Sequence, residues 1–112
     1  MNIVEAQIGD GCVMLDGVAI VQAALDDGPV KLGVRPEHLV PDENGPLHLT
    51  VMMTEPLGAN TLFHGRLADG SGFTASLQGV HPLLEPGKLM RFSIQPGQAH
   101  LFDVTTGLRV SI

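Results

Sequence analysis

The sequence has neither tryptophan nor tyrosine, a single cysteine, and six lysine and arginine residues against twelve aspartate and glutamate residues. Nucleic-acid binding draws on clustered cations and on aromatic rings that stack with bases, so this scarcity argues against a nucleic-acid partner. The one cysteine, Cys12, excludes an internal disulfide and is expected to be a small buried apolar side chain. Apolar residues still make up 44% of the chain, which is enough for a folded core.

Motifs that depend on a fixed spacing are also missing. No run of about 18 apolar residues occurs, so we predict no membrane-spanning helix. No basic segment precedes an apolar stretch near residue 1, and we expect no secretory signal. The stretch 86–89 lacks the glycine spacing and the hydroxyl of a phosphate-binding loop, and neither a nucleophile elbow nor a His-Glu-x-x-His motif occurs. The chain is therefore predicted to have no catalytic residue and no cofactor of its own.

Short β-rich segments separated by glycine turns are what the sequence does contain. Asp-Gly pairs favour tight turns because both residues tolerate positive φ, and they occur at 10–11, 16–17, 27–28 and 69–70. Strand-like alternation predicts strands at 3–8, 12–15, 18–21, 30–34, 47–53, 61–67, 73–77, 90–94 and 99–104. Residues 22–25 fit either a helical turn or a strand end. This pattern predicts one all-β domain over residues 1–112, either a barrel or a sandwich. An OB-like β-barrel of short antiparallel strands is favoured, because closure would hide the edges of the sheet.

The longest alternation follows a polar loop at residues 41–46. It places Leu47, Leu49, Val51 and Met53 on one face and is broken only by Met52. A later segment, 100–103, is expected to direct Leu101 or Phe102 into the core, with Phe102 favoured as a core residue. Asp103 is expected to cap the turn through residues 105–107.

The stretch Leu32-Gly33-Val34-Arg35-Pro36-Glu37-His38-Leu39 reads as a buried strand that runs into a turn. Pro36 cannot donate to a ladder and biases Arg35 towards an extended conformation, which places Arg35, Glu37 and His38 together at a strand end. One interpretation is a structural clamp, in which Arg35 holds Glu37 or a neighbouring carboxylate. The other is a small site that binds an anion or a partner. The chemistry of the residues alone favours the clamp.

This octet resembles the signature of the TOBE-class C-terminal regulatory domain of ABC-transporter ATP-binding subunits, most closely those of maltose and glycerol-phosphate importers. Residues 55–61 and the run His100 to Asp103, followed by Thr106-Gly107 and Arg109, fit the same family in the same order. The resemblance covers about residues 30–109. It implies an OB-like barrel that forms the C-terminal part of a longer subunit whose ATPase domain is not in this chain.

The resemblance also implies a function. The domain would regulate and stabilise a dimer of ATP-binding subunits in a bacterial importer of sugar or glycerol phosphate, and would perform no chemistry. The expected contact residues are Arg35, Glu37 and His38, with Glu55 and Asn60 second. The expected partners are a second subunit, the transmembrane permease subunits and a regulatory protein. ATP and Mg²⁺ would bind the ATPase domain, and the subunit would be cytoplasmic and peripheral to the inner membrane.

Residues 55–61 carry a second hypothesis. Their structural interpretation is a corner, because Pro56 ends ladder pairing and Gly58 allows a tight turn. Alternatively, backbone N–H groups of Gly58, Ala59, Asn60 and Thr61 form an anion nest, as in TOBE domains that bind molybdate or sulfate. Asn60 stands where the sugar-importer group often has an acidic residue. An OB-fold nucleic-acid binder and an enzyme are the least favoured functions.

Five histidines raise the question of a metal site. None has another histidine or a cysteine two or four residues away, so local spacing gives no ligand pair. Two strands would still be able to bring His48 and His64 opposite each other. We expect no native metal site.

Overall fold

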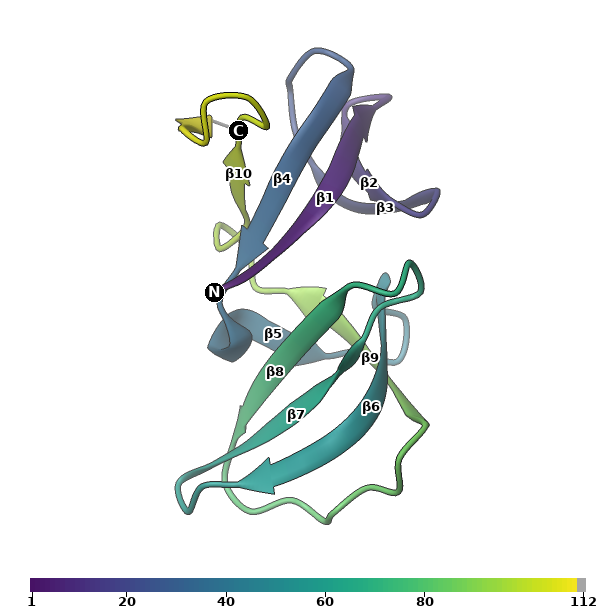
Figure 1. Cartoon of the computed structure of the whole chain (residues 1–112), viewed down its shortest axis with the longest axis vertical. Coiled ribbons are helices and arrows are strands. Elements are labelled where there is room, and N and C mark those ends of the chain that lie inside the picture. The colour runs from purple at the N-terminus through teal and green to yellow at the C-terminus, as the bar shows by residue number, and fades with distance from the viewer. Residues whose placement is uncertain (111–112) are drawn as a thin grey trace.

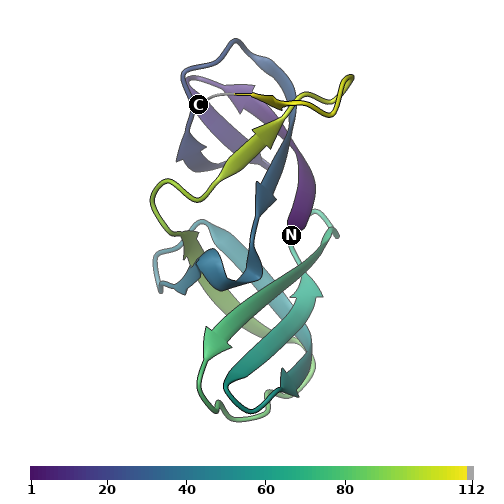
Figure 2. The ribbon, with the colours of Figure 1, turned by 90° about the vertical axis from the view of Figure 1, so that its left-hand side faces the viewer.

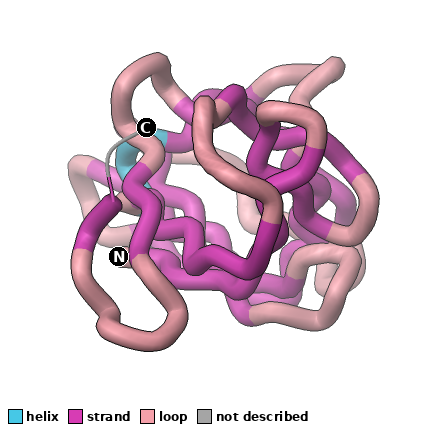
Figure 3. The backbone as a smooth tube through the Cα atoms, turned by 90° about the horizontal axis from the view of Figure 1, so that it is seen from above, coloured by secondary structure: helices cyan, strands magenta, loops and turns pink. Residues whose placement is uncertain are grey.

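Short antiparallel strands, numbered β1 to β11, and one 3-10 helix form this computed structural model, in which residues 1–110 are described. The strands form two sheets that lie one above the other along the longest axis, and the described chain extends over 42 × 24 × 23 Å. The N-terminus lies between the two sheets (Figure 1). Viewed along the long axis, the strands surround a centre and do not form flat layers (Figure 3). The all-β, OB-like fold class is confirmed.

The first sheet combines strands from both ends of the chain, in the order β11-β10-β4-β1-β2-β3. Its strands are β1 (Asn2–Gly9), β2 (Cys12–Leu15), β3 (Val18–Gln22), β4 (Gly28–Val34), β10 (His100–Phe102) and β11 (Arg109–Val110). At the β1–β2 turn Asp10 and Gly11 have φ of 53° and 74°, and at the β2–β3 turn Asp16 and Gly17 have 49° and 79°. Two central residues with positive φ are what a type I′ hairpin requires, so the sequence-based prediction of these turns is confirmed.

The second sheet has the order β5-β9-β6-β7-β8. It consists of β5 (Leu39–Pro41), β6 (Leu47–Pro56), β7 (Asn60–Arg66), β8 (Gly72–Gln78) and β9 (Lys88–Ile94). The chain enters this sheet from β4 through the 3-10 helix η1 (Pro36–His38) and returns to β10 through residues 95–99. Figure 2 shows both connections between the two sheets. Strand β10 then pairs with β4, and β11 extends the first sheet beyond β10.

A β-bulge in β6 overturns one expectation. The pairing of β6 with β7 shifts register between Val51 and Met53, so two β6 residues face one residue of β7. Beyond the bulge the alternation is reversed, and Met53 is 54% exposed. The prediction that Met53 shares the buried face of Leu47, Leu49 and Val51 is therefore wrong, while the three earlier positions are buried as predicted.

One apolar cluster contains residues from both sheets. Its largest fully buried side chains include Phe63, Phe92, Leu32 and Leu101. Residues 22–25 resolve into a strand end, because β3 stops at Gln22 and Ala23 N donates to Gly11 O at 2.8 Å. Cys12 is only half-buried, since it begins strand β2 beside an exposed turn.

The C-terminal segment corrects two further predictions. The predicted strand 99–104 is shorter, spanning His100–Phe102, and a strand that was not predicted, β11, pairs with it. Leu101 is fully buried, whereas Phe102 is half-buried, because neighbouring residues of a strand point to opposite faces. The predicted cap is confirmed: Asp103 Oδ1 accepts hydrogen bonds from the N–H groups of Thr105 and Thr106, both at 2.8 Å. Across residues 1–110, no helix has the length and apolar character needed to cross a membrane.

Candidate functional site

A backbone hydrogen bond closes the turn after β4. Arg35 has φ −74° and ψ 142°, and its carbonyl accepts a hydrogen bond from His38 N at 3.0 Å. Arg35 and Glu37 are exposed, and the only ion pair within residues 1–110 joins His64 to Glu55. The clamp interpretation, in which Arg35 holds a carboxylate, is therefore wrong for the described residues. The turn presents its charged side chains to the surroundings.

Strand β10 brings the C-terminal motif against this turn. His100 pairs with Gly33, and Phe102 pairs with Lys31. A Cβ atom at Gly33 would lie 2.7 Å from Met1 Sδ and 2.8 Å from Phe102 Cε2. The absence of a side chain at Gly33 thus lets Met1 and Phe102 lie directly over β4. This close approach gives the glycine of the octet a structural role.

Four basic side chains, which we name the junction cluster, gather where the two sheets meet: Arg35, His38, His100 and Arg109. Burial first, and then the charges of Arg109, Arg35 and His38, hold the pKa of His100 below its usual value. The Nδ1 atoms of His38 and His100 are buried, and neither has a hydrogen-bond partner among the described residues. Two motifs that lie far apart in the sequence therefore supply one group of cationic and imidazole side chains.

A cavity of about 530 Å³ adjoins the junction cluster. His100 and Arg109 line it, together with the amide side chains Gln22 and Gln95 and several apolar residues. A backbone hydrogen bond joins the cavity lining to the turn after β4, since Gln95 N donates to His38 O at 2.9 Å. The cavity thus combines cationic and amide hydrogen-bond donors with an apolar lining, which is typical of small-molecule sites.

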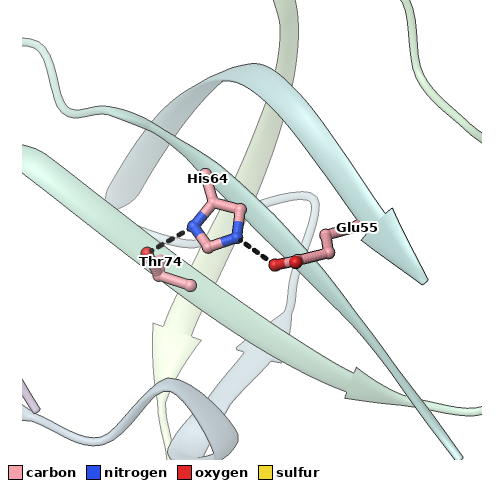
Figure 4. A network of polar contacts seen from close by, with 3 residues as sticks. All are labelled: Glu55, His64 and Thr74. Atoms are coloured by element: carbon pink, nitrogen blue, oxygen red, sulfur yellow. Dashed lines mark hydrogen bonds and ion pairs between the residues drawn. The ribbon is translucent and has the colours of Figure 1, made fainter. Parts of the chain in front are cut away.

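Glu55, one of the predicted contact residues, takes part in a polar network across the second sheet (Figure 4). Its Oε1 lies 3.0 Å from His64 Nε2, and His64 Nδ1 lies 3.1 Å from Thr74 Oγ1. An ionised carboxylate can only accept, so Nε2–H donates to Glu55, while Nδ1 accepts from the Thr74 hydroxyl in a neutral imidazole and donates to it in a protonated one. A hydroxyl, an imidazole and a carboxylate in this order also occur in hydrolases. Here the three side chains bridge adjacent strands and do not line the junction cavity.

His48 and His64 do not lie opposite each other, so the histidine pair that the sequence left open does not form. His48 faces Arg91 of β9, whereas His64 faces Met53 across β6 and β7, because β6 pairs with a different strand on each side. Within residues 1–110, no group of three or more His, Cys, Asp or Glu side chains is placed to hold a metal ion.

The predicted corner at residues 55–61 is confirmed. Strand β6 ends at Pro56, Gly58 has φ of 85°, and Leu57 N donates to Asn60 O at 2.8 Å. Asn60 Nδ2 also donates to Ser76 Oγ at 3.3 Å, and the buried Thr61 hydroxyl donates to Gly79 O at 2.9 Å. These bonds do not involve the backbone N–H groups of the anion nest, which stays a prediction.

The predicted contact residues separate into two groups. Arg35, Glu37 and His38 lie at the junction of the sheets, whereas Glu55 and Asn60 lie at the far end of the second sheet, where β6 turns into β7 (Figure 1). Their role in contacts stays a prediction. The sequence placed His100 and Arg109 in a family motif but did not predict that they lie next to the turn after β4.

A bridge formed by Asn2 was also missed. Its Nδ2 donates to Thr74 O at 2.7 Å, and its Oδ1 accepts from Thr74 N at 2.9 Å. The side-chain amide thus pairs with the edge of β8 much as another strand would, and it links the first sheet to the second. No local pattern identifies this role, since the partner lies in a distant part of the sequence.

The fold and the charged junction define this protein as an antiparallel, OB-like β-barrel domain. Comparison with known protein families then shows to which family it belongs. Residues 32–102 match the TOBE domain family. Because the match covers more than half of the residues, the chain belongs to the TOBE domain family.

Three curated relatives illustrate the similarity. The sn-glycerol-3-phosphate import ATP-binding protein UgpC of Ruegeria sp. (strain TM1040) is 46% identical over 113 residues, covering 99% of this chain and 32% of the relative. The protein of the same name from Ruegeria pomeroyi is 39% identical, with the same coverage. The sulfoquinovosyl glycerol transport ATP-binding protein SmoE of Agrobacterium fabrum is 33% identical, covering 95% of this chain and 32% of the relative. The chain therefore spans about a third of the length of these curated relatives.

Proposed function

We propose that this chain is the regulatory and dimer-stabilising domain of an ATP-binding subunit in an ABC importer of sugar or glycerol phosphate. The observation that carries the proposal is the alignment of 99% of the chain with about a third of an import ATP-binding protein. The three motifs that indicated the family fall within the aligned region. Relatives named for glycerol phosphate and for sulfoquinovosyl glycerol support a small polar solute carrying an anionic group.

The proposed mechanism is differential contact. ATP and Mg²⁺ bind the ATPase part of the longer subunit, and this domain stabilises one arrangement of the paired subunits over another. A regulatory protein that prefers one arrangement would shift the balance between them. The permease subunits contact the ATPase part, and the assembly lies at the cytoplasmic face of the inner membrane.

Exposed apolar side chains at the far end of the second sheet support a pairing surface. Met52, Met53, Leu57, Val80, Leu83 and Leu89 are each more than half exposed. Hydrogen bonds hold their segments together: Gly79 N donates to Ala59 O at 2.7 Å, and Gly87 N donates to Val51 O at 2.8 Å. Gathered apolar residues on the surface commonly mark a protein–protein contact. We assign the contact with a second copy of the domain to this region, which we name the apolar end.

Molar mass by light scattering over a concentration series tests the proposal. We expect a dimer, and we expect Leu83→Glu to convert it to a monomer, because a buried unpaired carboxylate opposes association. Leu108→Glu is the matched control, since Leu108 is equally exposed, at 69%, but lies in the turn between β10 and β11. A monomer at every concentration would remove pairing through this domain. Repeating the series with molybdate and with sulfate tests the alternative function, since assembly only with an oxyanion would favour an oxyanion-binding module.

A further inference from the structure

The junction cluster concentrates positive charge in a chain whose formal net charge is −6. Lys31, Gly33 and Arg35 alternate along β4 and its extension and so point to one side. Phe102 pairs with Lys31 on one side and Arg109 on the other, and His100 pairs with Gly33. Cross-strand partners share a face, so three of the six lysine and arginine residues and His100 converge on one side of the first sheet.

These cations form no ion pair with a carboxylate among residues 1–110, where the only ion pair is the one between His64 and Glu55. Asp103, which follows β10, already accepts hydrogen bonds from Thr105 and Thr106. Glu37 is exposed on η1. Glu5 lies opposite Lys31 in the pairing of β1 with β4 and offsets the charge of that lysine, whereas Arg35, Arg109 and His100 form no ion pair within residues 1–110. A bound anion would stabilise this group of like charges.

Buried hydrogen-bonding atoms point to the same conclusion. The Nδ1 atoms of His38 and His100 are buried and have no hydrogen-bond partner within residues 1–110, although buried polar atoms in folded proteins nearly always have one. When protonated, each of these atoms is a donor, and each guanidinium adds a planar set of donors that fits an oxyanion. The adjoining cavity of about 530 Å³ exceeds the needs of a bare tetrahedral anion and leaves room for a short polar substituent.

We propose that the junction cavity binds a phosphate dianion, either as free inorganic phosphate or as the head group of a small phosphate monoester. Arg109 and His100 contact the phosphate oxygens, and Arg35 and His38 complete the positive surroundings. The amide side chains Gln22 and Gln95 lie where a polar substituent would extend. This site goes beyond the proposed regulatory function, because it gives the domain a small-molecule ligand and does not depend on pairing.

Binding should be coupled to proton uptake. The groups that face His100 are Arg109 from β11 and Arg35 and His38 from the turn after β4, and these positive groups add to burial in holding its pKa low. A bound dianion reverses this field, raises the pKa of His100 and favours its protonated form. Affinity should therefore rise as the pH falls from 8 to 6. Sulfate is the appropriate probe of this coupling, because it remains a dianion throughout that range.

The experiment follows the ring signals of the five histidines by NMR while the 112-residue chain is titrated at low ionic strength. The probes are inorganic phosphate, glycerol 3-phosphate and sulfate, with chloride and glycerol as controls. We expect saturable shifts of His100 and His38, and we expect the signals of His48, His64 and His81 to stay in place. Tighter binding of glycerol 3-phosphate than of inorganic phosphate would identify a monoester as the ligand, and the reverse order would identify free phosphate.

Three variants that each remove one positive charge test whether phosphate binding depends on the position of that charge. Arg109→Gln should weaken phosphate binding about tenfold or more, because it removes a charge-assisted hydrogen bond. Arg35→Gln, at an exposed position, should weaken it less. Lys88→Gln removes the same charge from an exposed position on β9 and should leave binding unchanged. Equal losses in the three variants, or shifts of all five histidines that do not saturate, would overturn the site. The regulatory proposal would survive that result, because light scattering tests it separately.

Discussion

Replacing Gly65 by alanine should destabilise the domain far more than replacing Gly72, the other glycine within a strand of the second sheet. A Cβ atom at Gly65 would lie 2.0 Å from Thr50 O and 2.8 Å from the carbonyl carbon of Thr50. Ordinary contacts between non-bonded heavy atoms begin near ~3.5 Å, so β6 and β7 would have to part by roughly 1.5 Å. Backbone atoms cannot rotate away, and the separation falls beside the Val51–Gly65 pair at the bulge.

The magnitude follows from what this separation breaks. Losing one or two ladder hydrogen bonds costs about 1–3 kcal/mol, and the displaced packing adds about 1–3 kcal/mol. We expect Gly65→Ala to lower the free energy of unfolding by about 3 kcal/mol, which is a large share of the roughly 5–15 kcal/mol typical of a domain. The loss should appear as a lower midpoint in urea at an unchanged slope.

Two other glycines provide the comparison. Gly33→Ala places Cβ near Met1 Sδ and Phe102 Cε2, which are tips of side chains that can rotate, so its cost should be about 1 kcal/mol. Gly72→Ala meets no atom of the described residues within 4 Å and should be neutral or slightly stabilising. Far-UV circular dichroism is the appropriate signal because the chain contains no tryptophan or tyrosine. Equal stability of Gly65→Ala and Gly72→Ala would refute the close approach of β6 and β7.

Three further predictions concern single polar side chains. Asn2→Ala should lower the free energy of unfolding by about 1–2 kcal/mol in urea, because both hydrogen bonds to Thr74 are lost; an unchanged midpoint would show that this bridge is unimportant. Hydrogen bonds from Thr106 and Thr105 hold the pKa of Asp103 below its usual value. The ionised carboxylate therefore stabilises the folded domain fully above the unfolded pKa near 3.8, and this contribution is lost as the pH falls through the lower folded pKa. Asp103→Asn should remove this acid dependence of the free energy of unfolding. Burial and nearby cations lower the pKa of His100, so the free energy of unfolding should fall as the pH drops below about 6.5, where the unfolded chain takes up the proton first. His100→Gln should reduce that fall. A pH profile identical to that of the unsubstituted protein would contradict this role of His100.

Much of the fold was predictable from local pattern. Alternation identified the main strands, since burying one face of a sheet imposes a period of two residues. Asp-Gly pairs identified two hairpins, because both central positions need positive φ. Met53 was misplaced because a bulge inserts one residue and reverses the alternation, and only the break at Met52 hinted at it. Strand β11 has two residues and makes no periodic pattern, so it emerges only from its pairing with β10.

The candidate site was predictable only in part. The turn after β4 was visible because Pro36 restricts the chain next to three polar side chains. Its supposed clamp failed because sequence proximity does not say which way Arg35 points at the end of a strand. His100 and Arg109 join the turn through the pairing of β10 with β4, a contact between distant parts of the chain. Such pairing depends on the whole sheet and not on local propensity.

The position of the junction cluster explains why a ligand there would matter for regulation. The chain crosses between the sheets twice, through the turn after β4 and through residues 95–99, and the cluster lies beside both crossings. The turn and β10 are held together by the His100–Gly33 pair and by the bond from Gln95 N to His38 O. A ligand that neutralises Arg35, Arg109 and the two histidines would stabilise this connection, and with it the orientation of the apolar end relative to the first sheet. If phosphate changed the histidine signals but left the dimer mass unaltered, the two sites would be independent. A change in the dimer dissociation constant on adding phosphate would show that they are coupled, and linkage then requires pairing to change phosphate affinity by the same factor.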